Sequence, residues 1–277
     1  MAGFADFDAY LNALTVSEYG QELGFQKNAS FTTVAGTHNT LWATPGLPTT
    51  GVYTGSADTA VQATSSTTGA LYFANATSPR KLFMTAIEAL IATTGMTGTL
   101  IVLDRLLYYP GIDHADATHP LTNGVALSRY TTGRGVMAFL EVTTALGVTA
   151  RNATLTYTDQ SGNSSTSATI AITASASAQQ ICHAPLYFPL AAGDYGIRSV
   201  TDLTFSGTNS GISCLVLAKE LARIPIGAAF QTATKDLLRS GVGAPQIADN
   251  ACLMFLFLPA AAVATPSFNG TIYACEN

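Results

Sequence analysis

The chain has 277 residues, enough for one large β domain or two smaller ones, and a formal net charge of -5. Only 10% of its residues are charged, against about 25% in an ordinary soluble domain. The absence of a basic cluster argues against a nucleic-acid partner, and the absence of a run of about 20 apolar residues argues against a membrane-spanning helix.

The shortage of charge needs an explanation, because Thr, Ser, Asn and Gly must then cover the surface. Disorder would explain it, but the many Leu, Ile, Val and Phe residues argue against a disordered chain. Burial of the surface against other subunits explains it better, because interface cores are depleted in charge. The composition therefore predicts an assembly protein, a homo-oligomer that contacts copies of itself.

The N-terminal region is predicted to form a short helix followed by an arm. In residues 4–14 the apolar side chains recur with helical spacing, which places Phe4, Phe7 and Leu11 on one face. Residues 28–79 contain a single charged residue, Asp58, and many turn-forming residues. We expect extended segments and loops that lie on a neighbouring subunit or on the main domain, with full disorder as the alternative. Trp42, Phe4 and Phe7 are the candidate interface anchors.

From residue 80 onward the sequence alternates between short apolar runs and turn signals. Residues 82–91 fit either a helix or a strand, and the break at Thr94-Gly95 favours a strand with a hairpin. Residues 110–123 are predicted to be a long loop and residues 235–239 a short helical turn. The remaining predicted strands are 99–109, 135–146, 153–157, 167–174, 181–190, 199–205, 212–217, 251–258 and 270–274.

Strands at intervals of about ten residues, separated by turns, are typical of an all-β fold of the β-sandwich or jelly-roll kind. We therefore predict two units. Residues 1–79 form the N-terminal helix and the extended, charge-poor arm. Residues 80–277 form the β-sandwich or jelly-roll-like domain.

One polar cluster stands out, in the predicted loop 110–123. Asp113, His114, Asp116 and His119 are residue types that bind zinc or manganese. Loops also carry Asp and His for turns and for solvation, and no distant fourth ligand is apparent. The plain loop is the preferred interpretation, so no metal and no cofactor are expected.

The sequence lacks the common catalytic motifs: no G-x-S-x-G elbow, no H-E-x-x-H and no phosphate-binding G-x-x-x-x-G-K-[ST]. Paired acids that cleave glycosides meet only in the fold, so their absence is not established by sequence. His183 follows Cys182 in an apolar run and is interpreted as a packed or hydrogen-bonded core residue. We expect a protein that is not an enzyme.

The cysteines and two isolated arginines are given structural interpretations. Cys182, Cys214, Cys252 and Cys275 are predicted to be buried free thiols. The alternative is crosslinks within or between subunits, for which Cys275, near the chain end, is the best candidate. Isolated cations in a charge-poor chain should be paired. The candidate pairs are Arg198 with Asp194 and Arg223 with Glu220.

Six short phrases, in order along the chain, resemble a group of structural proteins of tailed-bacteriophage virions whose specific function is usually unassigned. They occupy residues 24–27, 98–106, 154–162, 192–200, 221–225 and 249–254. The resemblance implies a location in the virion, after assembly in the host cytoplasm, and no catalytic residues to carry over. The chain departs from the group in its long predicted loop at 110–123, which suggests a contact specific to this phage.

Four functions remain open at this stage. The first is a capsid decoration or cement protein that bridges subunits of the major capsid protein and stabilises the head. The second is a ring component of the tail, collar or baseplate, and the third a module that binds the host surface or a glycan. The fourth, an enzyme such as a depolymerase, has no visible constellation of residues to support it.

Overall fold

The computed structural model describes residues 7–15, 19–238 and 244–277. Within these ranges the chain is nearly all-β, as the sequence predicts, and none of its helices is long and apolar enough to cross a membrane. The elements are α1 (Phe7–Thr15), β1 (Gly20–Asn28), β2 (Asn39–Thr40), β3 (Gly46–Leu47), β4 (Val61–Gln62), β5 (Leu82–Ile91), β6 (Gly98–Asp113), β7 (Thr118–Pro120), β8 (Val136–Thr144), β9 (Arg151–Asp159), β10 (Ser164–Thr166), β11 (Ile170–Ile172), β12 (Ile197–Phe205), β13 (Ile212–Ile226), β14 (Ala233–Asp236), β15 (Gln246–Ile247), β16 (Leu253–Pro259) and β17 (Ser267–Glu276).

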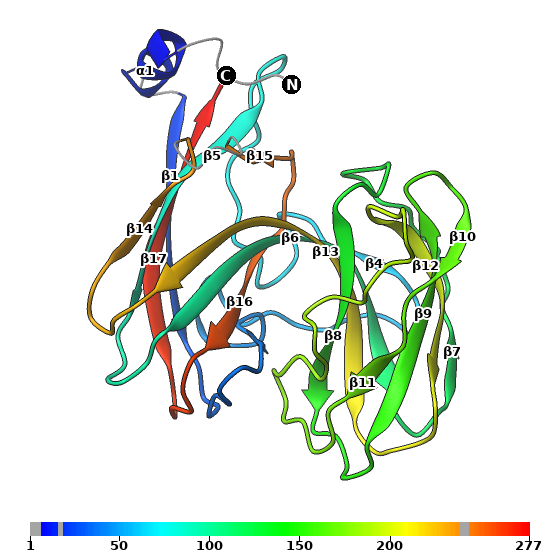
Figure 1. Cartoon of the computed structure of the whole chain (residues 1–277). Coiled ribbons are helices and arrows are strands. Elements are labelled where there is room, and N and C mark those ends of the chain that lie inside the picture. The colour runs from blue at the N-terminus through cyan, green and yellow to red at the C-terminus, as the bar shows by residue number, and fades with distance from the viewer. Residues whose placement is uncertain (1–6, 16–18, 239–243) are drawn as a thin grey trace.

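The strands form three antiparallel sheets. The first sheet has the order β14-β5-β17-β1-β3, with β15 beside β5, and the central sheet has the order β2-β16-β6-β13-β8, with β4 beside β6. The outer sheet has the order β10-β9-β12-β7, with β11 beside β9. Figure 1 shows the first and outer sheets in two separate lobes, with the long strands β6 and β13 running through both. We call them the first lobe and the second lobe.

The sequence pattern of each strand reflects how many of its faces are covered. Strand β9 alternates: Leu155 and Tyr157 point into the core, and the threonines between them point outward. Strand β6 has no such alternation, because residues 100–110 are all buried. A continuous apolar run is what a strand covered on both faces requires.

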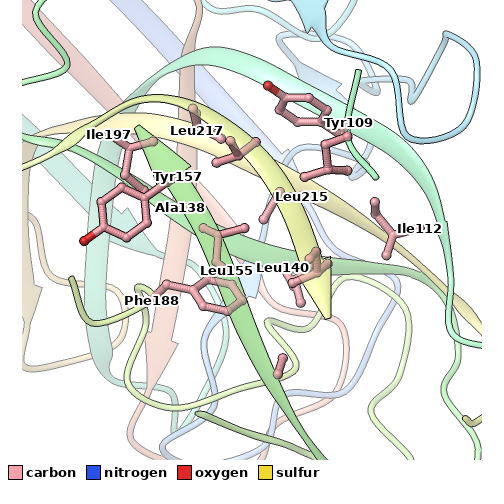
Figure 2. Packing of buried hydrophobic residues seen from close by; sticks show 14 of the residues in the cluster. Tyr109, Ile112, Ala138, Leu140, Leu155, Tyr157, Phe188, Ile197, Leu215 and Leu217 are labelled. Atoms are coloured by element: carbon pink, nitrogen blue, oxygen red, sulfur yellow. The ribbon is translucent and has the colours of Figure 1, made fainter. Parts of the chain in front are cut away.

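Three clusters of buried side chains fill the spaces between the layers. The first sheet packs on the central sheet in the first lobe, with Phe25, Phe255 and Phe257 among the side chains between them. The outer sheet packs on the central sheet in the second lobe, where Leu155, Tyr157 and Leu215 interdigitate (Figure 2). The third cluster lies on the remaining face of the central sheet.

The segment that covers this remaining face is the predicted arm. Trp42, Ala63 and Ala70 are buried there against strands of the same chain. The accessible surface of the chain is 11463 Å², close to the roughly 11,300 Å² expected of a compact monomer of this mass. The arm therefore lies on the main domain, which is one of its two predicted positions.

The boundary predicted at residue 79 does not separate two structural units. Strand β1 lies inside the first sheet, hydrogen-bonded to β17 on one side and β3 on the other. Residues 61–62 likewise pair with β6 in the central sheet.

Three element predictions are wrong. Residues 181–190 form only isolated bridges at Ile181 and His183, because Pro185 and Pro189 have no N–H to donate to a ladder. Residues 235–236 belong to strand β14, which pairs with β5, so sheet pairing replaces the predicted helical turn. The predicted loop 110–123 is shorter, because β6 continues to Asp113 and β7 forms within it.

Candidate functional site

The densest arrangement of charge lies on β6 where this strand passes from one lobe to the other. Asp104 and Arg105 are adjacent and completely buried, with core residues of the first lobe before them and of the second lobe after them. Successive side chains of a strand point to opposite faces, so the two residues need separate partners. Both partners come from other parts of the chain. We call these four residues the sealed charges: Asp104, Arg105, Arg129 and Glu141.

Arg105 forms an ion pair with Glu141 of β8, at 2.5 Å between Nη1 and Oε1. Both side chains have no exposed surface. Burial lowers the pKa of Arg105. The charges of Glu141, Cys214 and Tyr53, with the hydrogen bond to Glu141, together raise it more, so the pKa lies above its ordinary value and the guanidinium stays charged. The buried pair fixes β6 against the far strand β8 across β13.

Aromatic rings surround the same guanidinium. Its central carbon lies 4.7 Å from the ring centroid of Trp42 and 4.8 Å from that of Tyr108, with Tyr53 at 5.7 Å. A cation held against ring faces gains electrostatic stabilisation, more so where water is excluded. Trp42 and Tyr53 both belong to the predicted arm, so the buried cation fixes the arm to the central sheet.

Trp42 is therefore an anchor within its own chain. It is 1% exposed, and its Nε1 donates a hydrogen bond to the carbonyl of Val52 at 3.3 Å. Gly51 lies against the indole, where an added Cβ would approach Cε2 to 2.3 Å, so only glycine fits. The prediction that Trp42 is an interface residue is wrong, because its own chain already covers it.

Asp104 is held by Arg129 in a two-pronged pair. Nε and Nη2 of Arg129 donate to the two carboxylate oxygens at 3.0 and 2.8 Å. Arg129 also donates to the carbonyls of Ala63 and Arg105, and Asp104 accepts from the backbone N–H of Cys252. Arg129 lies on the segment after the 110–123 region, so this pair ties that segment to both the arm and β6.

Lys27 is a third buried cation and has no acidic partner among the described residues. Its Nζ donates to the carbonyls of Thr44 at 3.1 Å, Pro48 at 2.8 Å and Thr49 at 3.4 Å, which satisfies all three ammonium protons. Burial lowers its pKa to about 8. The side chain holds the turn of residues 44–49, which follows Trp42 and leads to Gly51, the glycine that lies against the indole.

Many charged side chains of the described residues lie in the interior of the protein. Eight charged side chains are buried: Lys27, Asp104, Arg105, Arg129, Glu141, Arg151, Asp159 and Glu276. A surface already poor in charge by composition is made poorer by the fold. Asp104, Arg105 and Glu141 have no exposed surface and Arg129 is 7% exposed, and the contacts that these side chains make position strands.

The predicted metal-binding cluster does not converge. His114 is buried, with Nε2 2.7 Å from Ser213 Oγ, while His119 Nδ1 lies 3.0 Å from Asp58 Oδ1. Asp113 accepts from the backbone N–H of Ala115 as a turn residue, and Asp116 follows in the same turn. In the part of the chain that the structure describes, no three His, Cys, Asp or Glu side chains are placed to hold a metal ion.

The other predicted residues have mixed outcomes. The pair of Arg223 with Glu220 is confirmed at 2.5 Å, but Asp194 accepts from Tyr157 Oη at 2.6 Å and does not pair with Arg198. Cys275 is a fully buried free thiol, which confirms the favoured interpretation over the alternative of a crosslink. The other three cysteines are also buried and free, as predicted. Phe4 and the side chain of Phe7 lie outside the described residues.

His183 is a hydrogen-bonded core residue, as predicted. Its Nε2 accepts from the backbone N–H of Leu140 at 3.0 Å, and its Nδ1 donates to the carbonyl of Pro185 at 2.9 Å. Burial lowers its pKa to about 4. The ring is therefore neutral at physiological pH and links the 181–190 segment to β8.

The outer sheet presents a flat, hydroxyl-rich face to solvent. Thr154 of β9 lies opposite Thr204 of β12, which in turn lies opposite Thr118 of β7. The next row brings together Thr166, Thr156, Asp202 and Pro120. β-branched side chains on a pleated surface are stiff, so this face loses little conformational entropy when another surface packs on it.

No protein-family model and no curated protein matches the sequence. Among solved structures, the chain has a weak likeness to the structure of infectious bursal disease virus Gt strain, with 7% identity, a TM-score of 0.18, and coverage of 93% of this chain and 80% of that chain. The crystal structure of the infectious bursal disease virus VP2 subviral particle gives 8% identity, a TM-score of 0.18, and coverage of 93% and 81%. Likenesses at this level carry no argument about fold or function.

Proposed function

We propose that this chain is a structural, non-catalytic component of a tailed-bacteriophage virion. The observation that carries the proposal is the placement of charge. The fold buries eight of the described charged side chains and leaves a surface rich in Thr, Ser, Ala and Gly. Such a surface suits extensive contact with other subunits, because few strongly hydrated groups must be desolvated.

The resemblance noted in the sequence supports the same proposal. Three of its six phrases contain Lys27, one or more of the sealed charges, or a residue that donates a hydrogen bond to a sealed charge. Residues 98–106 contain Asp104 and Arg105, residues 24–27 contain Lys27, and residues 249–254 contain Cys252, which donates to Asp104. The phrases thus include residues that determine the internal architecture.

Within the virion we propose a capsid decoration or cement role, in which the chain bridges subunits of the major capsid protein. Because the arm is packed on its own chain, the bridging contacts would come from folded surfaces such as the threonine face of the outer sheet. Many modest contacts repeated by the symmetry of the shell would stabilise the head. A ring component of the tail, collar or baseplate is the alternative location.

The test is addition of the purified chain to capsids that lack it, with bound copies counted by quantitative mass spectrometry. A decoration protein saturates at a fixed copy number set by the capsid lattice. A variant with Thr154→Lys and Thr204→Lys places two cations on the threonine face, and we expect it to bind at least about tenfold more weakly. Val148→Lys, at a residue that is 84% exposed and outside this face, is the matched control.

Electron cryomicroscopy of the intact virion from the source phage separates the remaining outcomes. Density on the capsid lattice supports the decoration role, and density in the neck, tail or baseplate replaces it with the ring role. Absence of the chain from purified particles rejects both.

A further inference from the structure

One end of the first lobe is formed by four loops without a single charged residue. These are residues 29–37, between β1 and β2; 92–97, between β5 and β6; 227–232, between β13 and β14; and 260–266, between β16 and β17. Figure 1 shows them at the end of the lobe that is remote from both chain termini. We call this surface the uncharged end.

Backbone hydrogen bonds connect the four loops into one surface. The N–H of Thr33 donates to the carbonyl of Val263 at 3.0 Å, and the N–H of Ala260 donates to the carbonyl of Thr97 at 2.9 Å. The N–H of Phe230 donates to the carbonyl of Ile91, at the start of the 92–97 turn, at 2.8 Å. Loops tied in this way are ordered in advance, which reduces the entropy lost when a partner binds.

The uncharged end exposes apolar side chains among small or uncharged polar ones such as Ser30 and Thr32. Phe230 is 61% exposed and Val34 is 48% exposed. Ala260, Ala262 and Ala264 are also exposed along the 260–266 loop. Exposed apolar side chains that gather at one end of a molecule, without charge among them, are a feature of interaction sites on soluble proteins.

The opposite end of the same lobe differs. Around the chain termini, Lys81 is exposed and Arg80 lies within 4.0 Å of Glu276. The contrast within one lobe shows that the missing charge at the uncharged end is a local property and not only a result of the average composition.

We propose that the uncharged end is a self-association surface, which packs against the same end of a second copy of this chain about a two-fold axis. The net charge of -5 makes most approaches of two copies repulsive, whereas this end brings no carboxylate toward its partner. A two-fold contact pairs a surface with itself, so an apolar, uncharged surface meets its own chemistry and no ion is desolvated.

The self-contact is a property of the isolated chain and does not depend on the virion assignment. Its test is sedimentation velocity of the full chain over a concentration series. We expect a monomer–dimer equilibrium in which Val34→Glu raises the dissociation constant at least about tenfold, because two carboxylates then face an apolar surface. Ala262→Glu, on a separate loop, should have the same effect. Val148→Glu makes the same kind of change at an exposed residue of the second lobe and should leave the dissociation constant within about twofold.

A mixing experiment tests whether the surface meets itself. An equal mixture of Ala262→Glu and Ala262→Lys chains should dimerise more strongly than either variant alone. Circular dichroism melting confirms that each variant is folded, and if Val34→Glu is not, Ala262→Glu decides the result.

Three results would overturn the proposal: a wild-type chain that stays monomeric at all concentrations, dimers unaffected by both glutamates, or equal weakening by Val148→Glu. Binding of another virion protein at this end by a chain that stays monomeric would also overturn it.

Discussion

Two ion pairs in this molecule have the same separation and opposite surroundings. Arg105 and Glu141 lie 2.5 Å apart with no exposed surface, while Arg223 and Glu220 lie 2.5 Å apart with side chains that are 45% and 28% exposed. Distance alone would rank them as equal. The difference in exposure means that loss of one partner leaves a bare charge in the interior in the first pair and a hydrated charge in the second.

Loss of one partner from the buried pair Arg105–Glu141 should therefore lower the free energy of unfolding by more than the intact pair contributes to it. Desolvation of both ions offsets much of their attraction, so replacement of the pair by apolar residues of similar volume can be nearly neutral. Removal of one partner has no such compensation. The following predictions use the two pairs, and the buried His183, to test this contrast.

The largest effect is expected for Glu141→Gln. The guanidinium of Arg105 would remain buried among Trp42, Tyr53 and Tyr108 without a counter-charge, and we expect the free energy of unfolding to fall by about 3–5 kcal/mol. Denaturant titration followed by tryptophan fluorescence measures this, because Trp42 is the only tryptophan. The double variant Arg105→Met, Glu141→Leu should recover at least half of the loss. A loss below about 1 kcal/mol for Glu141→Gln would contradict the contrast.

A smaller effect is expected for the pH dependence that His183 causes. Its folded-state pKa of about 4 lies below the ordinary value of 6.5, so protonation favours the unfolded chain. The stability that the neutral ring provides is complete above about pH 6.5 and is lost as the pH falls toward 4. Between about pH 7 and pH 5 the wild type should lose about 2 kcal/mol more than His183→Gln. Denaturant titrations at the two pH values measure the difference, and equal losses would show that His183 is accessible to protons when folded.

The smallest effect is expected for Glu220→Gln. Arg223 remains hydrated without its partner, and Tyr187 can still donate to the amide oxygen, so the free energy of unfolding should change by at most about 0.5–1 kcal/mol. The change should shrink further in high salt, where exposed charges are screened. A loss as large as that of Glu141→Gln would mean that exposure does not distinguish the two pairs.

The sequence predicted the strands whose pattern is local. Residues 199–205 follow their periodicity, and the break at Thr94-Gly95 favours a strand over a helix for residues 82–91. The structure places β12 and β5 there. Predictions failed where a distant partner decides the structure. Strand β14 exists because β5 offers an open edge. The segment 181–190 forms no ladder and is held to β8 by the hydrogen bond from the N–H of Leu140 to its own His183.

The candidate site was harder to predict for the same physical reason. The Asp-Arg dipeptide inside the apolar run 99–109 was a usable signal, because two charges in a buried strand must have partners. Nothing near them in sequence identifies Arg129 or Glu141, which the topology alone brings into contact. Residues 28–79 are predicted to form extended segments and loops that lie on another surface, and the structure buries Trp42, Ala63 and Ala70 against the central sheet. The partner of the arm was not predicted, because Trp42 suits a surface of its own chain as well as one of a neighbour.

The length of β6 and β13 has a mechanical consequence. The two strands are hydrogen-bonded from Gly98 with Ile226 at one end to Asp113 with Ile212 at the other, so one ribbon extends through both lobes. Antiparallel ladder bonds lie perpendicular to the strands. A force that pulls the lobes apart along the ribbon is therefore carried by the covalent backbones of both strands, each of which runs from one lobe into the other, and the ladder bonds between them need not break. The two lobes should resist separation under tension as one unit.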